Sequence, residues 1–532
     1  MSKLIFFSGG VCSSLGKGVA ASSLGALLES RGLNVRMVKC DPYINVDAGN
    51  MSPYQHGEVY VTDDGAETDQ DLGNYAHFTS GPLSQANSIT TGQVYDSVIR
   101  KEREGRYLGR CVQVIPHITD EIKSRIMAVA NEEPDTDIVI VEIGGTVGDI
   151  ESIPFLEAAR QLIHESGRGN AISAHLTLVP EVGGGELKTK PTQHSVKSMQ
   201  ETGIQPDLLI CRAPLMLDEA TRRKIAQFTN VENDSVFTST DLDTTIYEVP
   251  LMFYEQKLDQ VVLKKLGLEA RQADIGPWKA VMERFASRKG KLRIAIVGKY
   301  IELHDAYKSV YDALFHASLE CGVEVELLKI ASTRLEEAEA VEAVFEGGVD
   351  GLLVPGGFGK RGIGGMVKAA AWARENKIPY FGISLGMHIM LIEWGRNILG
   401  WEDADSTEFN REAGHPVVSH IAEQAEGKKP LWRLGKYGSR AEGGTRFFAA
   451  YGEGIVSERY RHRYEFSNRY RQEMTGSGLV IGSINPENDI VECVEWPNHP
   501  WGLGVQFHPE FKSKPTAASP LFRDFIMAAK NR

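Results

Sequence analysis

Short apolar runs that end at glycine open both halves of the sequence. Residues 4–7 (LIFF) are followed by Ser8-Gly9-Gly10, and residues 292–297 (LRIAIV) by Gly298-Lys299. Runs this short, rich in β-branched or aromatic side chains, are typical of strands buried on both faces of a parallel sheet. The same kind of run recurs at residues 138–141, 208–210, 351–354 and 380–383.

Helical patterns lie between these runs, for example at residues 20–30 and 367–375. Strands that alternate with helices predict parallel sheets covered by helices on both faces. The charged stretch 267–290 carries one amphipathic pattern at residues 278–287, which indicates a linker with a helix. We therefore predict an α/β fold of two doubly wound parallel-sheet domains, 1–266 and 291–532, joined by that linker.

Composition excludes several classes of protein. The chain has 532 residues, 42% of them hydrophobic and 24% charged, as in an ordinary globular protein with a substantial core. At about 150 residues per domain, its length alone would suggest three or four domains, whereas the pattern indicates two. No apolar run approaches the roughly 18 residues of a membrane span, and the apolar start is too short for a signal peptide.

Charge and cysteine content narrow the setting further. With 58 Lys and Arg against 71 Asp and Glu, the net charge of −13 argues against a protein that coats nucleic acid. The 6 cysteines include no CxxC pair, so neither a disulfide framework nor a zinc site is indicated. We expect a reducing, cytoplasmic setting and no membrane or nucleic-acid partner.

A glycine-rich loop after the first strand is suited to phosphate. It runs from Gly9 to Gly18 and leads into a predicted helix, so its backbone N–H groups and Lys17 are available to an anion. It is not a Walker A loop, because five residues separate Gly10 from Gly16 and Gly18 stands in place of the metal-binding Ser or Thr. Phosphate binding is the favoured interpretation, and a tight turn at a helix start is the alternative.

Lysines and carboxylates follow other predicted strands. Lys39 lies where the second strand would end, and Glu142 directly follows the run at 138–141. The carboxylates of Glu142 and Asp71 are together suited to holding Mg²⁺ beside a polyphosphate. Each acid taken singly has the alternative of a solvated surface group. The glycines within 142–149 indicate close backbone approach to a ligand, and the cations and hydroxyls of 183–193 suit phosphate oxygens.

Five motifs resemble the amidoligase domain of the CTP synthase family, and the resemblance runs nearly unbroken from about residue 4 to residue 265. The motifs lie at residues 39–45, 56–59, 114–119, 142–151 and 188–193. The resemblance implies an ATP-dependent reaction in which UTP is phosphorylated at O4 and ammonia then displaces the phosphate at C4 to give CTP. Phosphoryl transfer fits these residues because it needs positioning and charge neutralisation more than a nucleophilic side chain.

The resemblance also implies roles for single residues. Lys17 would contact the ATP phosphates, Lys39 would stabilise charge in phosphoryl transfer, and Asp71 and Glu142 would hold Mg²⁺. The residues implied in binding nucleotide are Ser13, Ser14, Leu15, Gly16, Lys17, Gly18, Asp71, Asp149, Ile150, Glu151, Lys188, Thr189, Lys190, Gln193 and Lys224. The pyrimidine site among them would comprise Ser13, Lys188, Lys190, Gln193 and Lys224, and the region of CTP feedback would comprise Asp149, Glu151 and also Glu157.

Two small departures from the family pattern occur in this half. Gln70 stands where the family usually has leucine, and Gln93 stands where a cation is common. Neither removes an implied ligand, although an amide at position 93 would make a weaker phosphate contact than a cation.

The second half carries a nucleophile turn, a base and an acid. Residues 382–386 (GISLG) match G-x-S-x-G, the strained strand-to-helix turn that presents a nucleophile, here Ser384. Far downstream, His508 and Glu510 stand two residues apart and can lie on one side of an extended segment. The glycines of 355–359 suit an oxyanion hole. A lone His-x-Glu pair has a structural alternative, but the three pieces together indicate a catalytic site, and without the flanking residues this would be a serine hydrolase.

Those flanking residues resemble the class I glutamine amidotransferase domain of the same family, in which the nucleophile is cysteine. The matching stretches are 355–359, 382–387, 406–409, 461–465 and 507–510. The resemblance assigns Ser384, His508 and Glu510 to catalysis. The implied glutamine contacts are Gly357, Phe358, Leu385, His388, Glu408 and Arg463. A thiol beside histidine ionises near neutral pH, whereas a hydroxyl depends on base abstraction, so we expect glutamine to bind but to be hydrolysed slowly or not at all.

Two explanations for Ser384 stay open, a single engineered change and a natural divergence. Divergence is favoured because His388 replaces the family's glutamine, Asp405 replaces its asparagine, and residues 429–435 retain only the end of its lid motif. The altered lid also puts activation by GTP in doubt.

The preferred hypothesis is an enzyme that makes CTP from free ammonia. The retention of Lys17, Lys39, Asp71 and Glu142 argues against a catalytically silent, regulatory or filament-forming relative. The amidotransferase-like flanks argue against a serine hydrolase, and the pyrimidine-site motifs against an amidoligase for a cobyrinate or biotin precursor. The resemblance implies a homotetramer that uses UTP, ATP and Mg²⁺, with CTP as feedback inhibitor, glutamine or ammonia as nitrogen donor and GTP as a candidate allosteric activator.

Overall fold

The computed structural model describes residues 2–338, 340–345, 347–421, 432–452 and 454–532, and it divides into two compact units. The first unit comprises Met1–Asn50 and Asp71–Met282, and the second Met51–Gln70 and Glu283–Arg532. The segment Met51–Gln70 therefore clusters with the second unit, a feature that the hydrophobic pattern does not predict. The boundaries 1–266, 267–290 and 291–532 stay a prediction.

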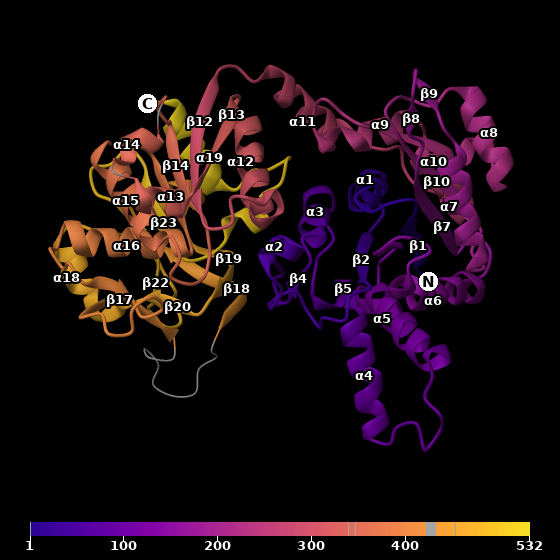
Figure 1. Cartoon of the computed structure of the whole chain (residues 1–532), viewed down its shortest axis with the longest axis horizontal. Coiled ribbons are helices and arrows are strands. Elements are labelled where there is room, and N and C mark those ends of the chain that lie inside the picture. Colours follow the sequence, from indigo (N-terminus) through magenta and orange to yellow (C-terminus); the bar gives the residue numbers. More distant parts are fainter. Residues whose placement is uncertain (1, 339, 346, 422–431, 453) are drawn as a thin grey trace. The chain divides into compact units, whose positions relative to one another are not determined.

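The first unit is built on a parallel sheet with the strand order β11-β10-β7-β1-β6-β2-β5 (Figure 1). The predicted runs at 4–7, 138–141 and 208–210 form three of its strands, confirming them. The central strand β1 is buried from Leu4 onward and pairs in parallel with both β6 and β7. The bounds are β1 Lys3–Gly9, β2 Val35–Asp41, β5 Ser88–Thr90, β6 Ile138–Ile143, β7 Ala171–Leu178, β10 Leu208–Ala213 and β11 Val236–Thr240.

Helices cover both faces of this sheet, as alternation predicts (Figure 1). Helix α1 begins at Lys17, three residues before the predicted start, because the glycine-rich loop turns directly into it. The helices are α1 Lys17–Ser30, α3 Asp71–Phe78, α4 Thr91–Arg103, α5 Thr119–Glu132, α6 Ile153–Ser166, α7 Lys190–Glu201, α8 Glu219–Thr229, α9 Val249–Glu255 and α10 Leu258–Leu266. A small hairpin joins β8 Glu181–Val182 to β9 Glu186–Leu187.

The second unit is built on a mixed sheet with the order β13-β12-β14-β15-β23-β22-β21-β18-β19. The five strands from β13 to β23 are parallel, as predicted, whereas β22, β21, β18 and β19 continue the sheet antiparallel. The bounds are β12 Lys291–Gly298, β13 Glu324–Ala331, β14 Gly351–Val354, β15 Tyr380–Ile383, β18 Arg433–Ala441, β19 Ile455–His462, β21 Val480–Ile484, β22 Val491–Glu495 and β23 Gly502–Val505. A smaller sheet joins β16 Ala404–Ser406, β17 His415–His420 and β20 Tyr464–Phe466.

Helices also pack on this second sheet. Helix α15 begins four residues before the predicted start at 367. The helices are α12 Lys308–Cys321, α13 Ser332–Glu337, α14 Val341–Val344, α15 Ile363–Glu375, α16 Leu385–Asn397, α17 Arg446–Tyr451, α18 Arg471–Gly476 and α19 Pro520–Lys530. Segment Met51–Gln70 adds α2 Pro53–His56 and a hairpin of β3 Tyr60–Val61 and β4 Glu67–Thr68.

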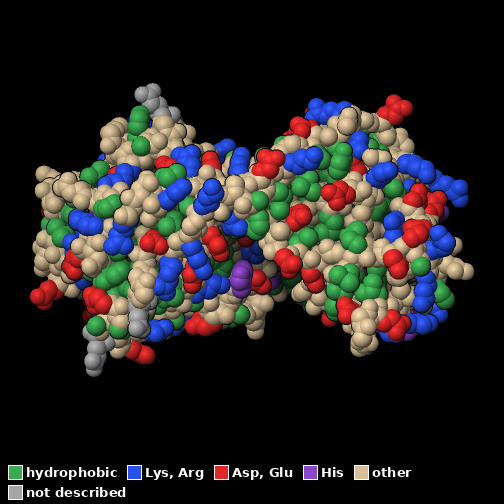
Figure 2. All heavy atoms as spheres, turned by 90° about the horizontal axis from the view of Figure 1, so that it is seen from above, with side chains coloured by type: hydrophobic (Ala, Val, Ile, Leu, Met, Phe, Trp, Pro, Cys, Tyr) green, Lys and Arg blue, Asp and Glu red, His purple; other side chains and the backbone are tan. Residues whose placement is uncertain are grey.

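The stretch predicted as a linker contains helix α11 Gly276–Ser287, which confirms the helix expected at 278–287. Its Trp278 is buried and stacks on Phe78 of α3 with ring centroids 5.5 Å apart. Among the described residues, no helix combines the length and the apolar character needed to cross a bilayer. Figure 2 shows acidic and basic side chains interspersed over the face it presents, rather than gathered by sign.

Candidate functional site

A buried cluster of opposite charges lies at the carboxyl end of the first sheet. Lys39, at the end of β2, makes an ion pair with Asp71 at the start of α3. Its Nζ lies 3.2 Å from Oε1 of Glu142 on β6 and 3.8 Å from Oδ1 of Asp41. Lys39 and Glu142 are 5% and 1% exposed, so these charges interact with little screening by water. The structure thus brings together the predicted phosphoryl-transfer lysine and both predicted Mg²⁺ ligands.

The cluster keeps its lysine charged and its carboxylate hard to ionise. Burial alone would lower the pKa of Lys39, but Asp71, Glu142 and Asp41 outweigh it and hold this pKa well above its usual value. Burial raises the pKa of Glu142, against the opposing effect of Lys39. Tyr75 of α3, fully buried, donates its hydroxyl proton to Oε2 of Glu142. The charge states of Lys39 and Glu142 therefore both depend on the contacts within this cluster.

The two carboxylates fit the magnesium ion that the resemblance implies. A Cβ built on Gly18 would lie 3.2 Å from Oδ1 of Asp71 and 3.4 Å from Oε2 of Glu142, so both side chains border the same small space. Two carboxylate oxygens beside a polyphosphate are a typical Mg²⁺ environment. Within the part of the chain that the structure describes, no group of three or more His, Cys, Asp or Glu could hold a metal. Two carboxylates suit Mg²⁺, which usually keeps several water ligands and binds substrate phosphates.

Backbone hydrogen bonds tie the loops of this edge together. The N–H of Gly10 donates to Leu176 at 3.0 Å, and that of Val147 to Gly9 at 2.8 Å. Lys17 Nζ donates to the carbonyl of Gly145 at 2.6 Å, and burial lowers the pKa of Lys17. The exposed members of these loops include Ser13, Ser14, Asp149, Ile150 and Glu151, whereas Leu15 and Gly18 are buried. These hydrogen bonds anchor the glycine-rich loop to the neighbouring strand and loop, and several of its residues face solvent.

The other predicted nucleotide contacts lie around α7 and α8. Lys188 pairs with Glu186 at 2.6 Å, and Lys190 at the start of α7 lies 5.8 Å from the ring centroid of Phe228. Gln193 is buried and donates to Oγ1 of Thr189 at 3.1 Å, while Lys224 on α8 is exposed. No hydrogen bond or ion pair in the described part of the chain joins any of these residues to Lys17 or Lys39. Glu157, the remaining member, forms a two-bonded ion pair with Arg160 at 2.8 Å, which lowers its pKa to about 2.

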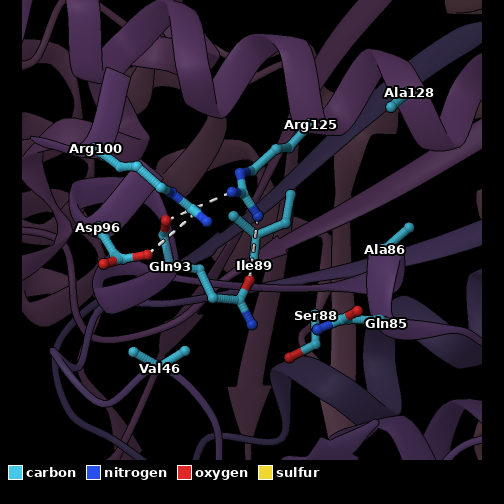
Figure 3. A pocket seen from close by; sticks show the side chains of 10 residues that line it. All are labelled: Val46, Gln85, Ala86, Ser88, Ile89, Gln93, Asp96, Arg100, Arg125 and Ala128. Atoms are coloured by element: carbon cyan, nitrogen blue, oxygen red, sulfur yellow. Dashed lines mark hydrogen bonds and ion pairs between the residues drawn. The ribbon is translucent and has the colours of Figure 1, made fainter. Parts of the chain in front are cut away.

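Gln93, one of the two departures, lines a pocket of about 450 Å³ at the edge of the first sheet (Figure 3). Arg125 of α5 donates to the side-chain oxygen of Gln93 at 3.4 Å and to its carbonyl at 3.5 Å. Arg100, in the same pocket, pairs with Asp96 at 3.3 Å (Figure 3). A guanidinium therefore lies beside the amide where the family commonly has a cation at position 93.

In the second unit, Ser384 occupies the sharp turn between β15 and α16. Its φ of 52° and ψ of −101° place it in a region that L-residues rarely adopt, as a nucleophile turn requires. Its N–H donates to Val505 at 2.7 Å, which holds the turn against β23. A Cβ built on Gly356 would lie 3.8 Å from Cβ of Ser384 and 3.0 Å from Cε1 of His508. The predicted nucleophile, base and hole are thus neighbours.

The predicted base and acid are held rigidly. His508 Nδ1 lies 2.7 Å from Oε1 of Glu510, the His508 N–H donates to Arg459 at 2.8 Å, and Phe511 stacks on the imidazole with centroids 5.2 Å apart. His508 is only 8% exposed, yet its Nε2 has no hydrogen-bond partner among the described residues. Nor does any hydrogen bond in that part of the chain involve the hydroxyl of Ser384. The base is oriented, but the Ser–His contact that would activate a hydroxyl is not formed.

Lys299 and Glu408 clamp the loop of the candidate oxyanion hole. Lys299 Nζ donates to the carbonyls of Gly359 and Phe358, the latter at 3.2 Å, and Oε1 of Glu408 accepts the N–H of Gly359 at 2.7 Å. Burial lowers the pKa of Lys299 to about 8 and raises that of Glu408. Within the described residues, the backbone N–H groups of Gly357 and Leu385 make no hydrogen bond, so they are available to an oxyanion.

The remaining predicted glutamine contacts differ in their surroundings. Arg463 is exposed, and its guanidinium lies 3.7 Å from the ring centroid of Trp432, which in turn meets Phe358 edge to face. His388 is buried, bonds Oε1 of Gln506 at 2.9 Å and has a pKa lowered by burial to about 4. Of the altered lid at 429–435, residues 429–431 lie outside the described residues.

Several side chains that contact the two sites escape sequence reasoning. Tyr75 and Arg459 reach them only through tertiary packing, and nothing local marks them. Lys299 directly follows a glycine that ends a predicted strand, and that signal would have sufficed to propose it.

Both sheets thus carry a candidate site at their carboxyl edges, a buried cluster of lysine and carboxylates in one unit and a strained serine turn beside an oriented histidine in the other. This combination defines the class of ligases that take nitrogen through an amidotransferase domain. The family described as CTP synthase N-terminus matches residues 3–268, and that described as glutamine amidotransferase class-I matches residues 302–528. The chain belongs to the CTP synthase family, whose members are carbon–nitrogen ligases with glutamine or ammonia as nitrogen donor.

The relatives match over the whole chain. CTP synthases of Geobacter sulfurreducens, Clostridium acetobutylicum and Aquifex aeolicus are 53%, 52% and 50% identical to it, over 99–100% of this chain and 98% of theirs. A solved structure described as the glutaminase domain of Trypanosoma brucei CTPS with bound acivicin is 38% identical over 45% of this chain and 94% of its own, with a TM-score of 0.43.

Proposed function

We propose that this chain makes CTP from UTP, ATP and free ammonia, and that its amidotransferase half hydrolyses glutamine poorly. The observation that supports this division is a contrast between the two sites. Lys39, Asp71 and Glu142 are in contact, whereas the hydroxyl of Ser384 and Nε2 of His508 make no hydrogen bond with each other. The ligase site is thus assembled, while the amidotransferase site lacks the contact its hydroxyl needs.

In the ligase half, the residues bind and neutralise polyphosphate. Lys17 and the backbone amides of the glycine-rich loop hold the ATP phosphates, and Asp71 and Glu142 hold Mg²⁺, which supplies charge neutralisation when bound. Oxygen O4 of UTP attacks the γ-phosphorus of ATP, the bond from that phosphorus to the β,γ-bridging oxygen breaks, and ADP leaves, while Lys39 stabilises the charge on the transferred group. Ammonia then adds at C4, and inorganic phosphate leaves with the former O4. Ser13, Lys188, Lys190, Gln193 and Lys224 bind the UTP.

In the amidotransferase half, the groups proposed to bind glutamine are present, whereas serine stands at the position of the family's cysteine nucleophile. Arg463 and Glu408 take the carboxylate and ammonium of glutamine, and the amides of Gly357 and Leu385 face its side-chain carbonyl. The hydroxyl of Ser384 has a far higher pKa than a thiol, so it attacks only if His508 removes its proton in the same step. Without that contact, most of the bound glutamine is released unchanged.

Four further properties follow from the family. The chain assembles as a homotetramer in the cytoplasm. CTP inhibits it at a site that includes Asp149, Glu151 and Glu157. GTP activates it only to the extent that the altered lid at 429–435 still permits. Size-exclusion chromatography with light scattering, and CTP and GTP titrations of the ammonia reaction, test the assembly, the inhibition and the activation.

The central experiment measures CTP formation from UTP, ATP and Mg²⁺ with either ammonium or glutamine as nitrogen source. We expect ammonium to support turnover and glutamine to support little. Glutamine-supported rates close to the ammonium-supported rates would refute the claim of an impaired amidotransferase. Absence of CTP with ammonium would refute the ligase function itself.

A further inference from the structure

A buried histidine that the proposed mechanism does not use links three elements of the first unit. His175 lies on β7 with no exposed surface. Its Nδ1 is 2.8 Å from Oγ of Ser8 on β1, and its Nε2 is 2.8 Å from Oγ of Ser195 on α7. The two serines are 1% and 6% exposed, so the whole relay is closed to water.

The ring carries no charge at neutral pH. Burial, with a smaller contribution from Lys17, lowers the pKa of His175 to about 3, so the imidazole stays neutral throughout the working range. A neutral imidazole offers one donor and one acceptor, and a serine hydroxyl serves either, so all three side chains are satisfied. A fully satisfied buried polar network fixes position, because any slip leaves a polar group unpaired in an apolar core.

A second rung joins the same strand and helix. Thr177, two residues along β7, lies with its Oγ1 3.0 Å from Oγ1 of Thr192, three residues before Ser195 on α7. Residues two apart on a strand and three apart on a helix share a face, so the two rungs are parallel. Two polar rungs between otherwise apolar surfaces set the axial register of α7 against β7. That register also sets where the first turn of α7, with Lys190 and Gln193, stands.

The relay also contacts the glycine-rich loop. A Cβ built on Gly10 would lie 1.7 Å from Oγ of Ser195 and 3.1 Å from Nε2 of His175, so the loop backbone rests directly on the relay. Leu176, the next residue on β7, accepts the N–H of Gly10 at 3.0 Å. The loop and the start of α7 are therefore both located by one side chain.

We propose that His175 is a positioning residue for nucleotide binding, which holds the glycine-rich loop and the first turn of α7 in one register through Ser8 and Ser195. It rests on the proposed function, because Lys17 on the loop side and Lys190 and Gln193 on the helix side are the groups assigned to polyphosphate. Phosphate clamps lose binding when their two sides shift by a fraction of an ångström to an ångström. His175 keeps that separation constant.

Two conservative substitutions separate the two hydrogen bonds. Glutamine places an amide near the former Nε2 and keeps the bond to Ser195, whereas asparagine places it near Nδ1 and keeps only the bond to Ser8. His175→Gln, His175→Asn and Ser195→Ala are compared with Ser173→Ala, which removes a buried hydroxyl without a partner from the same strand. The readouts are KM for UTP and ATP and kcat in the ammonium reaction, calorimetric dissociation constants for the two nucleotides, and Tm.

We expect His175→Asn and Ser195→Ala to lower kcat/KM roughly 10- to 100-fold, mostly through KM and with matching losses in nucleotide affinity. Ser173→Ala should stay within about threefold of the parent, and His175→Gln, which keeps the bond to Ser195, should lose less than His175→Asn and show an unchanged pH profile from pH 6 to 9. Unchanged KM and affinity with a lower Tm would overturn the proposal in favour of a purely structural role. So would a changed pH profile in His175→Gln, since it would show a titrating group. If the parent makes no CTP, the calorimetric affinities still decide the positioning role, and only the proposed function fails.

Discussion

Ser384 holds a backbone conformation with a φ of 52°, which side chains other than glycine adopt only at an energetic cost. That cost is still present although the family's thiol is not. The surrounding parts are also retained, since His508 keeps Glu510 at 2.7 Å and the loop of Gly359 keeps its clamps. The strained turn, the oriented histidine and the clamped loop are therefore held by contacts that do not involve the hydroxyl of Ser384.

The identity of residue 384 is tested by restoring the thiol. We expect Ser384→Cys alone to raise glutamine-dependent CTP formation only in part, because His388 and the altered lid remain. The double change Ser384→Cys with His388→Gln should raise it further. The glutamine-supported and ammonium-supported rates are measured side by side, and the ammonium rate serves as the internal control. Full recovery from the single change would point to one engineered substitution instead of divergence.

A second prediction at the scale of single residues concerns the role of Lys39 in the ligase reaction. Lys39→Met removes the cation between Asp71 and Glu142, and we expect a loss of roughly 100-fold or more in ammonium-dependent kcat. Lys197→Met, on the exposed side of α7, is the matched control and should retain the parent rate. Comparable activity of the two variants would remove Lys39 from phosphoryl transfer.

At the scale of elements, segment Met51–Gln70 supports His508, the proposed base, from outside the amidotransferase sequence. Tyr60 on β3 donates to the carbonyl of Phe511 at 3.1 Å, and their rings meet edge to face at 5.2 Å. Arg459 donates to the hydroxyl of Tyr60 and lies 2.6 Å from Asp63. Phe511 stacks on the imidazole of His508, and the backbone carbonyl of Arg459 accepts the backbone N–H of His508. Because the segment contacts both Phe511 and Arg459, it helps to fix the base.

Glu58 of this segment makes stability depend on pH. It accepts the N–H of Ser309 at 2.9 Å near the start of α12, and burial raises its pKa to about 8 from a usual 4.5. Between these values the folded chain holds a proton that the unfolded chain has released, so the free energy of unfolding falls as pH rises from 4.5 to 8. Glu58→Gln stays neutral, so we expect its Tm relative to the parent to increase from pH 5 to pH 9.

Glu302→Gln, at an exposed position in the same unit, controls for the loss of a surface charge. A constant Tm difference between Glu58→Gln and the parent across this range would contradict a buried, proton-binding Glu58.

The elements were predictable where the signal is local. Short apolar runs predict the strands at 4–7 and 351–354, and glycine spacing predicts the turn at Ser384. The structure has all three at these positions. The antiparallel strands β18, β19, β21 and β22 were missed, although β21 and β22 are close in sequence, because the prediction relied on glycine-ended apolar runs and on alternation with helices. Tyr75 and the network of His175 were missed for another reason, since a buried polar residue has no signature before its partners are known.

At the scale of the whole molecule, the chain divides into units that do not follow its two family segments. Residues 51–70 lie within the stretch 3–268 that matches the CTP synthase N-terminus, yet they cluster with Glu283–Arg532. Arg461 pairs with Glu67 at 2.7 Å, which adds to the contacts of Glu58 and Tyr60.

A fragment of residues 283–532 is therefore expected to be incomplete. We expect its Tm to rise when a synthetic peptide of residues 51–70 is added in excess, because a ligand that binds only the folded state stabilises it. A scrambled peptide of the same composition is the control. An identical Tm with both peptides would show that the segment contributes nothing to this unit.

The place of Met51–Gln70 in the chain limits how such enzymes exchange parts in evolution. The segment is bounded by Asn50 and Asp71, both of which belong to the ligase unit. A recombination event that cuts only between residues 267 and 290 transfers the amidotransferase sequence without segment Met51–Gln70, which supports His508. The ligase sequence left behind then keeps this segment without the unit that it packs on. Successful shuffling of nitrogen-supplying modules needs further crossovers inside the ligase gene. We therefore expect a lineage that abandons glutamine chemistry to lose its nucleophilic side chain before it loses the domain.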